Sequence, residues 1–213
     1  MKCDKKTMLL YAVTDRAWTG RQSLYEQVEA ALKGGATCVQ LREKELDDEE
    51  LLAEALKISV LCRQYKVPFI VNDNVDTAIQ CRADGIHVGQ EDLEVCRVRQ
   101  KAGDGMIIGV SVHSVEEAVE AVKNGADYLG VGAMFSTATK ADAKMLSKEI
   151  LREICAAVDV PVVAIGGISR ENIFQLEGSG VDGVALVSAI FSAEDIESEC
   201  RLLRRLSEEM VAA

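Results

Sequence analysis

The hydrophobic positions of this chain fall into short continuous runs separated by longer amphipathic segments. The runs are four to six residues long and lie at 9–14, 38–41, 69–72, 85–88, 106–110, 128–131, 162–165 and 184–187. Apolar runs that do not alternate with polar residues are typical of parallel strands buried on both faces. The segments between the runs are therefore expected to be helices that cover the sheet.

Three of these segments show a clear helical stripe. Segment 48–65 repeats apolar or small residues at Leu51, Leu52, Ala55, Leu56, Ser59 and Cys62. Segment 115–123 does so at Val115, Ala118, Val119 and Val122, and segment 194–211 at Ile196, Leu203, Leu206 and Met210. Ser114 with Glu117 predicts a capping box at the second helix, and Asp47 with Glu50 opens the first one similarly.

An internal repeat indicates how many strands to expect. Four short marks precede predicted strands, namely Gly35-Ala36-Thr37, Arg82-Ala83-Asp84, Gly125-Ala126-Asp127 and Gly180-Val181-Asp182. Their last residues are 47, 43 and 55 positions apart, about two strand–helix units each. Four double units predict eight strands and hence a single-domain α/β protein, a (β/α)8 barrel over residues 1–213. An open, doubly wound sheet is the structural alternative.

The composition restricts the classes of partner that the protein is expected to bind. The hydrophobic content is 48% and the aromatic content 4%, so the core is expected to be aliphatic. The net charge is −11, which argues against nucleic acid and against an anionic membrane surface as partners. It does not exclude a small anionic substrate, because a local cluster of cations can oppose the overall field.

The cysteines and the N-terminus favour a cytoplasmic protein. The seven cysteines form no C-x-x-C spacing, and Cys38, Cys62, Cys96 and Cys155 lie in apolar contexts. We expect them to be small buried hydrophobic residues in a reducing compartment. The N-terminus has no signal-peptide core, and no apolar run approaches the length of a membrane span. The oligomeric state stays open, a homo-oligomer included.

Small polar clusters follow five of the predicted strands, where the active sites of (β/α)8 barrels lie. They are Gln40-Leu41-Arg42-Glu43-Lys44, Asn72-Asp73, Gln90-Glu91-Asp92, Ser111 with His113, and Thr137-Ala138-Thr139-Lys140. Arg42 and Lys44 are two apart on an extended segment and share a side with Gln40, with Lys140 expected across the barrel. Such converging cations suit phosphate oxygens.

Two aspartates predict a magnesium site. Asp73 and Asp92 follow neighbouring strands, and Mg²⁺ takes few protein carboxylates beside water and substrate phosphate. Either aspartate could instead cap the helix that follows it.

The last strands predict a second phosphate site. Gly166-Gly167-Ile168-Ser169 reads as a tight strand-to-helix turn with Ser169 as the helix cap, and Val187-Ser188 opens a short apolar turn. Loops after strands 7 and 8 of barrels often bind phosphate through backbone N–H groups. A glycine pair can equally be a packing device. Segment 134–145 is expected to be a mobile lid over the substrate, with a plain surface loop as the alternative.

The two histidines are less informative. His87 lies inside a predicted strand and is expected to be a core or supporting residue, and His113 is expected near the site. No histidine or cysteine spacing suggests zinc.

These motifs resemble the thiamine-phosphate synthase family from about residue 9 to residue 191. The matching segments are Leu10-Tyr11-Ala12-Val13-Thr14-Asp15, Gln40 to Lys44, Val71-Asn72-Asp73, Gly85 to Asp92, Gly109-x-Ser111, Gly125 to Gly132, Thr137-x-Thr139-Lys140 and Gly166-Gly167-Ile168. The chain departs from the family by lacking the two prolines before Thr137, which should loosen the lid, and by carrying Ala141 where a lysine is common.

The resemblance implies a Mg²⁺-dependent transferase. Such an enzyme joins 4-amino-2-methyl-5-hydroxymethylpyrimidine diphosphate to 4-methyl-5-(2-phosphoethyl)thiazole and releases pyrophosphate. It implies that the pyrimidine diphosphate is bound by Gln40, Leu41, Arg42, Glu43, Lys44, Asn72, Ser111 and Lys140. Of these, Arg42, Lys44, Ser111 and Lys140 would be catalytic. Asp73 and Asp92 match the metal ligands, and the thiazole phosphate site would be Thr137, Ala138, Thr139, Gly166, Gly167, Val187 and Ser188.

Two other functions remain as alternatives. A thiazole tautomerase shares this barrel and a Ser-Val-His strand end, here Ser111-Val112-His113, and would use His113 as acid and base. A non-catalytic phosphate-binding barrel is the second. Neither explains why two cations and two aspartates stand at neighbouring strand ends.

Overall fold

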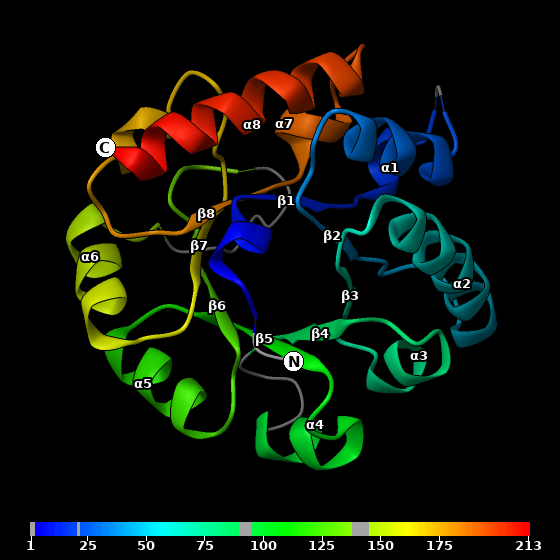
Figure 1. Cartoon of the computed structure of the whole chain (residues 1–213), viewed down its shortest axis with the longest axis horizontal. Helices are drawn as coiled ribbons and strands as arrows, with labels where there is room; N and C mark the ends of the chain where they lie inside the picture. The colour runs from blue at the N-terminus through cyan, green and yellow to red at the C-terminus, as the bar shows by residue number, and fades with distance from the viewer. Residues whose placement is uncertain (1–2, 21, 90–94, 138–144) are drawn as a thin grey trace.

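The structure is a computed structural model that describes residues 3–20, 22–89, 95–137 and 145–213. Eight parallel strands close into one barrel in the order β1 to β8 (Figure 1). Their bounds are β1 Leu10–Val13, β2 Cys38–Leu41, β3 Phe69–Asn72, β4 Gly85–Val88, β5 Ile107–Val112, β6 Tyr128–Val131, β7 Val162–Ile165 and β8 Gly183–Leu186. The predicted barrel is confirmed, and because β1 pairs with β8 the open sheet is excluded.

Helices surround the barrel (Figure 1). The α-helices are α1 Leu24–Lys33, α2 Asp48–Tyr65, α3 Val75–Gln80, α4 Val95–Ala102, α5 Val115–Lys123, α6 Lys148–Ala157, α7 Ser188–Phe191 and α8 Ile196–Ala212. Three 3-10 helices are η1 Lys5–Met8, η2 Arg16–Trp18 and η3 Ile173–Leu176. None of the described helices combines the length and the apolar content that a membrane crossing needs.

The core has two layers. The larger layer lies between the strands and the helices, and the smaller one fills the barrel. The interior layer consists of Met8, Tyr11, Val13, Cys38, Ile70, Ile107, Tyr128, Val163 and Ala185. Met8 belongs to η1, which contacts β8 and β1. The N-terminal segment therefore supplies part of the packing inside the barrel.

Two residues that the predicted helical stripes placed against the sheet are exposed instead. Leu56 of α2 and Val119 of α5 are each 46% exposed, whereas Ile58 and Ala121 are buried. A barrel helix buries only the stripe that touches the strands beneath it. Periodicity identified part of that stripe, and the contact with the strands decided the rest.

The four repeated marks connect the starts of neighbouring strands. Gly35, Gly125 and Gly180 have φ values of 98°, 102° and 90°, and Arg82 takes the same left-handed region at 53°. The last residue of each mark then accepts a hydrogen bond from a backbone N–H at the start of the preceding odd-numbered strand. The pairs are Thr37 with Leu10 (2.8 Å), and Asp84 with Phe69, Asp127 with Ile108 and Asp182 with Val162 (2.9 Å each). The repeat is thus a set of four clamps at the N-terminal end of the barrel.

Removing one clamp should destabilise the fold. Asp127→Ala would leave the Ile108 N–H without its acceptor and would break the ion pair with Arg99. We expect the free energy of unfolding in urea to fall by about 1–3 kcal/mol. Asp76→Ala removes an exposed carboxylate paired with Lys101 and should change it by less than about 0.5 kcal/mol. Equal stability of the two variants would contradict the clamp.

Helix caps were predicted in part. Asp47 accepts from the Glu50 N–H at 2.9 Å, as expected. Ser114 accepts from the Glu117 N–H at 3.2 Å, but the Glu117 carboxylate accepts from the backbone N–H of His113 and not from that of Ser114. The capping box is therefore only half formed.

The cap at the β7 turn and some of the cysteine positions are corrected. Ser169 caps no α-helix, because the chain forms η3 there with Asn172 at its cap position. No disulfide links any of the seven cysteines. Cys96 is exposed, and Cys3 and Cys155 are only partly buried, so the expectation of buried cysteines is wrong for these three.

Candidate active site

Two ion pairs lie where β1, β2 and β3 end. The Lys44 ammonium lies 2.5 Å from Oδ2 of Asp73, and Arg42 Nη1 lies 3.8 Å from the Asp15 carboxylate. The backbone N–H of Arg42 donates to Thr14 Oγ1 at 3.0 Å, which ties the start of this loop to the end of β1. Lys44 therefore meets Asp73 across two strand ends, and Arg42 lies beside Asp15 after β1. The convergence of all three side chains on one ligand stays a prediction.

The Asp73 carboxylate is placed so that it could bind a cation. Its φ of 62° lies in the left-handed region, which is uncommon for a residue with a side chain. It does not cap the following helix, because Asn74 performs that role. Its hydrogen bonds from Asn72 and Lys44 both end on Oδ2, and among the described residues no hydrogen bond reaches Oδ1. The part of the chain that the structure describes contains no cluster of three or more metal-ligating side chains.

Two members of the predicted substrate set point elsewhere. Leu41 is fully buried in the layer between strands and helices, because side chains alternate along a strand. The Glu43 side chain is 2% exposed and accepts a 3.0 Å hydrogen bond from Arg16 Nε. Both side chains are therefore shielded from solvent, and the prediction that these two residues bind the substrate stays a prediction.

A line of polar side chains crosses the barrel interior between two predicted substrate residues. Gln40 donates to the Tyr11 hydroxyl, which meets the Tyr128 hydroxyl, and each contact measures 2.8 Å. Tyr128 in turn meets His87 Nδ1 at 2.8 Å, and His87 Nε2 meets Ser111 Oγ at 2.9 Å. We call these five residues the interior chain. His87 is thus a supporting core residue, as predicted.

The interior chain explains two glycines in the strands. A Cβ at Gly109 would lie 2.0 Å from the Tyr128 ring, and one at Gly130 would lie 3.2 Å from the His87 ring. These positions leave room for the two rings. Tyr11 and Tyr128 were not singled out in the sequence, although a tyrosine within an otherwise aliphatic buried strand was a usable signal.

The interior chain is electrically neutral at the two tyrosines. Burial raises the pKa of Tyr11 and that of Tyr128 well above the usual range, so both phenols keep their protons.

His113 does not belong to the interior chain. Its Nδ1 contacts Glu117 at 3.2 Å and its side chain is 43% exposed.

Five of the predicted thiazole phosphate residues are described, and they follow β6, β7 and β8. They are Thr137, Gly166, Gly167, Val187 and Ser188. The N–H of Phe135 donates to the Gly166 carbonyl at 2.9 Å, which lays the segment after β6 along the β7 turn. A Cβ at Gly167 would lie 2.4 Å from the Ser136 carbonyl oxygen, so Thr137 follows directly beside this turn. After the neighbouring strand β8, Val187 is the cap residue and Ser188 the first residue of α7.

Several predicted residues lie outside the described part of the chain. They are Gln90, Glu91, Asp92, Ala138, Thr139 and Lys140, together with most of the predicted lid. The base of the lid segment is described. The Leu146 N–H donates to the Ala133 carbonyl at 2.8 Å and joins its two ends.

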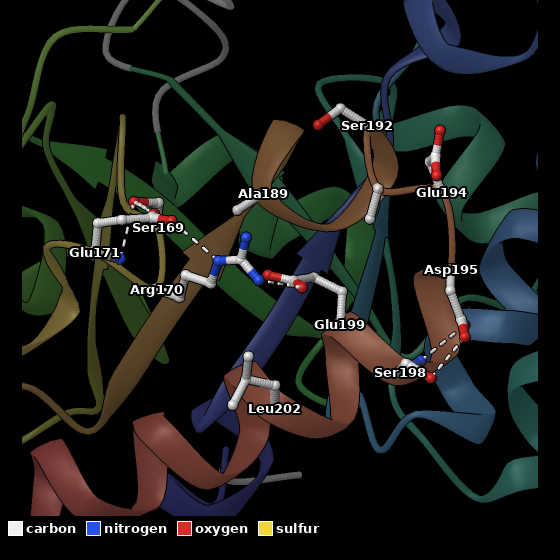
Figure 2. Close-up of a pocket in the computed structure, with 11 residues that line it drawn as sticks. Ser169, Arg170, Glu171, Ala189, Ser192, Glu194, Asp195, Ser198, Glu199 and Leu202 are labelled. Carbon is white, nitrogen blue, oxygen red and sulfur yellow. Dashed lines mark hydrogen bonds and ion pairs between the residues drawn. The ribbon is translucent and has the colours of Figure 1, made fainter.

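A pocket of about 510 Å³ lies outside this constellation, between the segment after β7 and the start of α8. Figure 2 shows Arg170 between two carboxylates, and its distances to Glu171 and Glu199 are 3.0 Å and 3.4 Å. Glu194 and Asp195 also line the pocket. The acidic surplus makes this pocket a poor site for a phosphate.

Comparisons with known proteins agree with this geometry. The family model described as thiamine monophosphate synthase matches residues 10–190. Thiamine-phosphate synthase of Clostridium acetobutylicum is 47% identical over 91% of this chain and 92% of its own length. That of Enterococcus faecalis is 44% identical over 98% of this chain and 99% of its own.

Solved structures give the same result. Thiamine phosphate pyrophosphorylase from Pyrococcus furiosus superposes with a TM-score of 0.90 and 40% identity, covering 97% of this chain and 98% of that one. A 3-hexulose-6-phosphate synthase, at 14% identity and a TM-score of 0.66, covers 93% of this chain and 99% of that one and shares the fold alone. The chain belongs to the thiamine monophosphate synthase family.

Proposed function

We propose that the protein joins 4-amino-2-methyl-5-hydroxymethylpyrimidine diphosphate to 4-methyl-5-(2-phosphoethyl)thiazole and releases pyrophosphate. The observation that carries this proposal is the placement of Lys44 beside Asp73 and of Arg42 beside Asp15, at the ends of three neighbouring strands. In a chain of net charge −11, two cations at adjoining strand ends suit an anionic ligand. Family membership supplies the identity of the two substrates.

The reaction is a dissociative substitution in which the protein stabilises the leaving group. Arg42, Lys44 and Lys140 take up the charge that develops on the pyrophosphate as the carbon–oxygen bond breaks. The aminopyrimidine spreads the positive charge left on its methylene carbon, and the thiazole nitrogen then forms the new bond. The site contributes mainly fixed charges and the alignment of the two substrates.

Magnesium fits this site by its donor chemistry. Mg²⁺ prefers oxygen ligands, and Asp73 presents Oδ1 while Lys44 and Asn72 hold Oδ2. Asp92 is proposed as the second carboxylate ligand. When bound, the ion would neutralise part of the charge on the diphosphate.

The thiazole phosphate is proposed to bind on the opposite side, at the ends of β6 to β8. The close approach of the Ser136 carbonyl to Gly167 makes the β7 turn narrow, and the backbone N–H groups there are suited to phosphate oxygens. Thr137, Thr139 and Ser188 would add hydroxyl donors. We propose a cytoplasmic enzyme whose partners are these small molecules.

Product analysis tests the function. With both substrates and Mg²⁺, we expect pyrophosphate and thiamine phosphate to appear in equal amounts, and neither to appear when the thiazole phosphate is omitted. Interconversion of thiazole isomers without pyrophosphate would identify a tautomerase instead. Phosphate binding without turnover would identify a non-catalytic barrel.

A further inference from the structure

The charged residues that follow β1 and β2 continue the register of these two strands. Paired residues of the strands are 27 positions apart in the chain. Beyond the strand ends, Asp15 lies beside Arg42 and Arg16 beside Glu43, at the same spacing. Each pair joins opposite charges, and the order of the charges is reversed between the two loops. The loop after β2 is therefore matched, residue by residue, to the loop after β1.

Glu43 is the buried member of these pairs. Its side chain is 2% exposed, whereas those of its neighbours Arg42 and Lys44 are 27% and 55% exposed. Its Oε2 accepts the hydrogen bond from Arg16 Nε at 3.0 Å, and its buried Oε1 has no hydrogen-bond partner among the described residues. A buried carboxylate is costly without an opposite charge. Glu43 therefore depends on Arg16 to stay in this position.

The turn that carries Arg16 is itself anchored. Arg16 begins η2, where Oδ1 of Asp15 accepts from the Ala17 N–H at 2.9 Å. The carbonyl of Trp18 accepts at 2.7 Å from Nε2 of Gln27, a residue of α1 that is 2% exposed. The turn is thus joined to a buried side chain of a barrel helix and can act as a fixed support.

We infer that Arg16 is a positioning residue for the diphosphate site. By holding the buried Glu43 carboxylate, it fixes the backbone between Arg42 and Lys44. The two cations are thereby oriented before the ligand binds, which lowers the cost of binding. Neither Arg16 nor Glu43 needs to touch the ligand for this role. The inference rests on the proposed function for the identity of the ligand, a diphosphate.

The surroundings of Arg16 make its loss hard to compensate. Arg16 also interacts electrostatically with Glu45 and Glu54, so its removal would leave three carboxylates without that cation. Breaking one member of a buried ion pair generally costs more than replacing both members. Without Arg16, Glu43 should therefore move toward water and displace the segment that carries Arg42 and Lys44.

Binding of inorganic pyrophosphate tests this role without turnover. With Mg²⁺ in excess, calorimetry should show that Arg16→Met raises the Kd of pyrophosphate by about 10-fold, because the two cations are no longer preorganised. Arg16→Lys keeps a cation that can reach Glu43 and should stay within about threefold of the unmodified protein. Asp127→Ala is the control for lost stability, since it loosens the other end of the barrel, and should leave the Kd within about twofold.

A double variant tests whether Arg16 acts through Glu43. Glu43→Gln keeps the shape of the side chain and removes its charge, and it should raise the Kd by about threefold. The combination of Arg16→Met with Glu43→Gln should bind no more weakly than Arg16→Met alone, because no buried charge is left unpaired. In steady state, Arg16→Met should raise the KM of the pyrimidine diphosphate and leave that of the thiazole phosphate within about twofold.

An unchanged Kd in Arg16→Met, or losses that multiply in the double variant, would overturn the positioning role. If Arg16→Met does not fold, Glu43→Gln decides, and an unchanged Kd there is equally contrary. Failure to form thiamine phosphate, together with weaker pyrophosphate binding by Arg16→Met, would reject the proposed function and leave the positioning role in place. Product formation with an unchanged Kd would reject the positioning role alone, and no pyrophosphate binding by the unmodified protein would reject both.

Discussion

Arg42→Ala is expected to lower kcat by about two to three orders of magnitude, the usual effect of removing a fixed charge aimed at a developing anion. The backbone of Arg42 is held by Thr14, and Nη1 lies 3.8 Å from Asp15. The guanidinium is therefore positioned before the substrate arrives. Steady-state pyrophosphate release measures the loss.

Two further variants separate charge from geometry. Arg42→Lys keeps the charge but loses the planar fork that contacts two phosphate oxygens. Its kcat should therefore fall between that of the unmodified enzyme and that of Arg42→Ala. Arg201→Ala removes one positive charge from the exposed surface of α8 and should retain full activity. Turnover of Arg42→Ala within threefold of the unmodified enzyme would reject the assigned role.

Removal of Mg²⁺ is expected to abolish turnover, and Asp73→Asn should raise the Mg²⁺ concentration needed for half-maximal activity by at least about 10-fold. The reason is that a neutral amide is a weaker ligand than a carboxylate for a hard dication. The amide also gives up the ion pair that restrains Lys44. The unmodified enzyme and Asp73→Asn should be assayed over a series of free Mg²⁺ concentrations set with a chelator.

Asp76→Asn is the matched control for this experiment. Asp76 is the second residue of α3, three residues from Asp73, and its side chain is 64% exposed. Its Mg²⁺ dependence should equal that of the unmodified enzyme. Activity that persists after complete chelation, or an unchanged Mg²⁺ dependence of Asp73→Asn, would exclude the metal role of Asp73.

Local patterns in the sequence predicted most of the strands and their number. Five of the eight strands have the predicted bounds, because a strand buried on both faces must be apolar throughout and is interrupted only where it meets solvent. The number of strands was predicted from the four repeated marks, which end at Thr37, Asp84, Asp127 and Asp182. Each needs a left-handed turn and a side-chain acceptor, and both leave a visible local signature.

The candidate site was predicted less completely. The strand-end rule is confirmed for Lys44 and Asp73, which meet although they follow different strands, since all strands of a parallel barrel end on one side. It could not tell that the side chains of Leu41 and Glu43 are buried, because the facing of loop residues depends on neighbours such as Arg16. It also left open whether Asp73 caps the following helix, a role that Asn74 takes.

The sequence by itself determined the number of strands, the layered core and the end of the barrel at which the chemistry gathers. These follow from periodicities and turns that involve residues close together in the chain. Only the tertiary structure decided the interior chain, in which Tyr11 and Tyr128 are 117 positions apart and yet share a hydrogen bond. Such a contact depends on the closure of the barrel, which sets the distance across its interior and leaves no periodic trace along the chain.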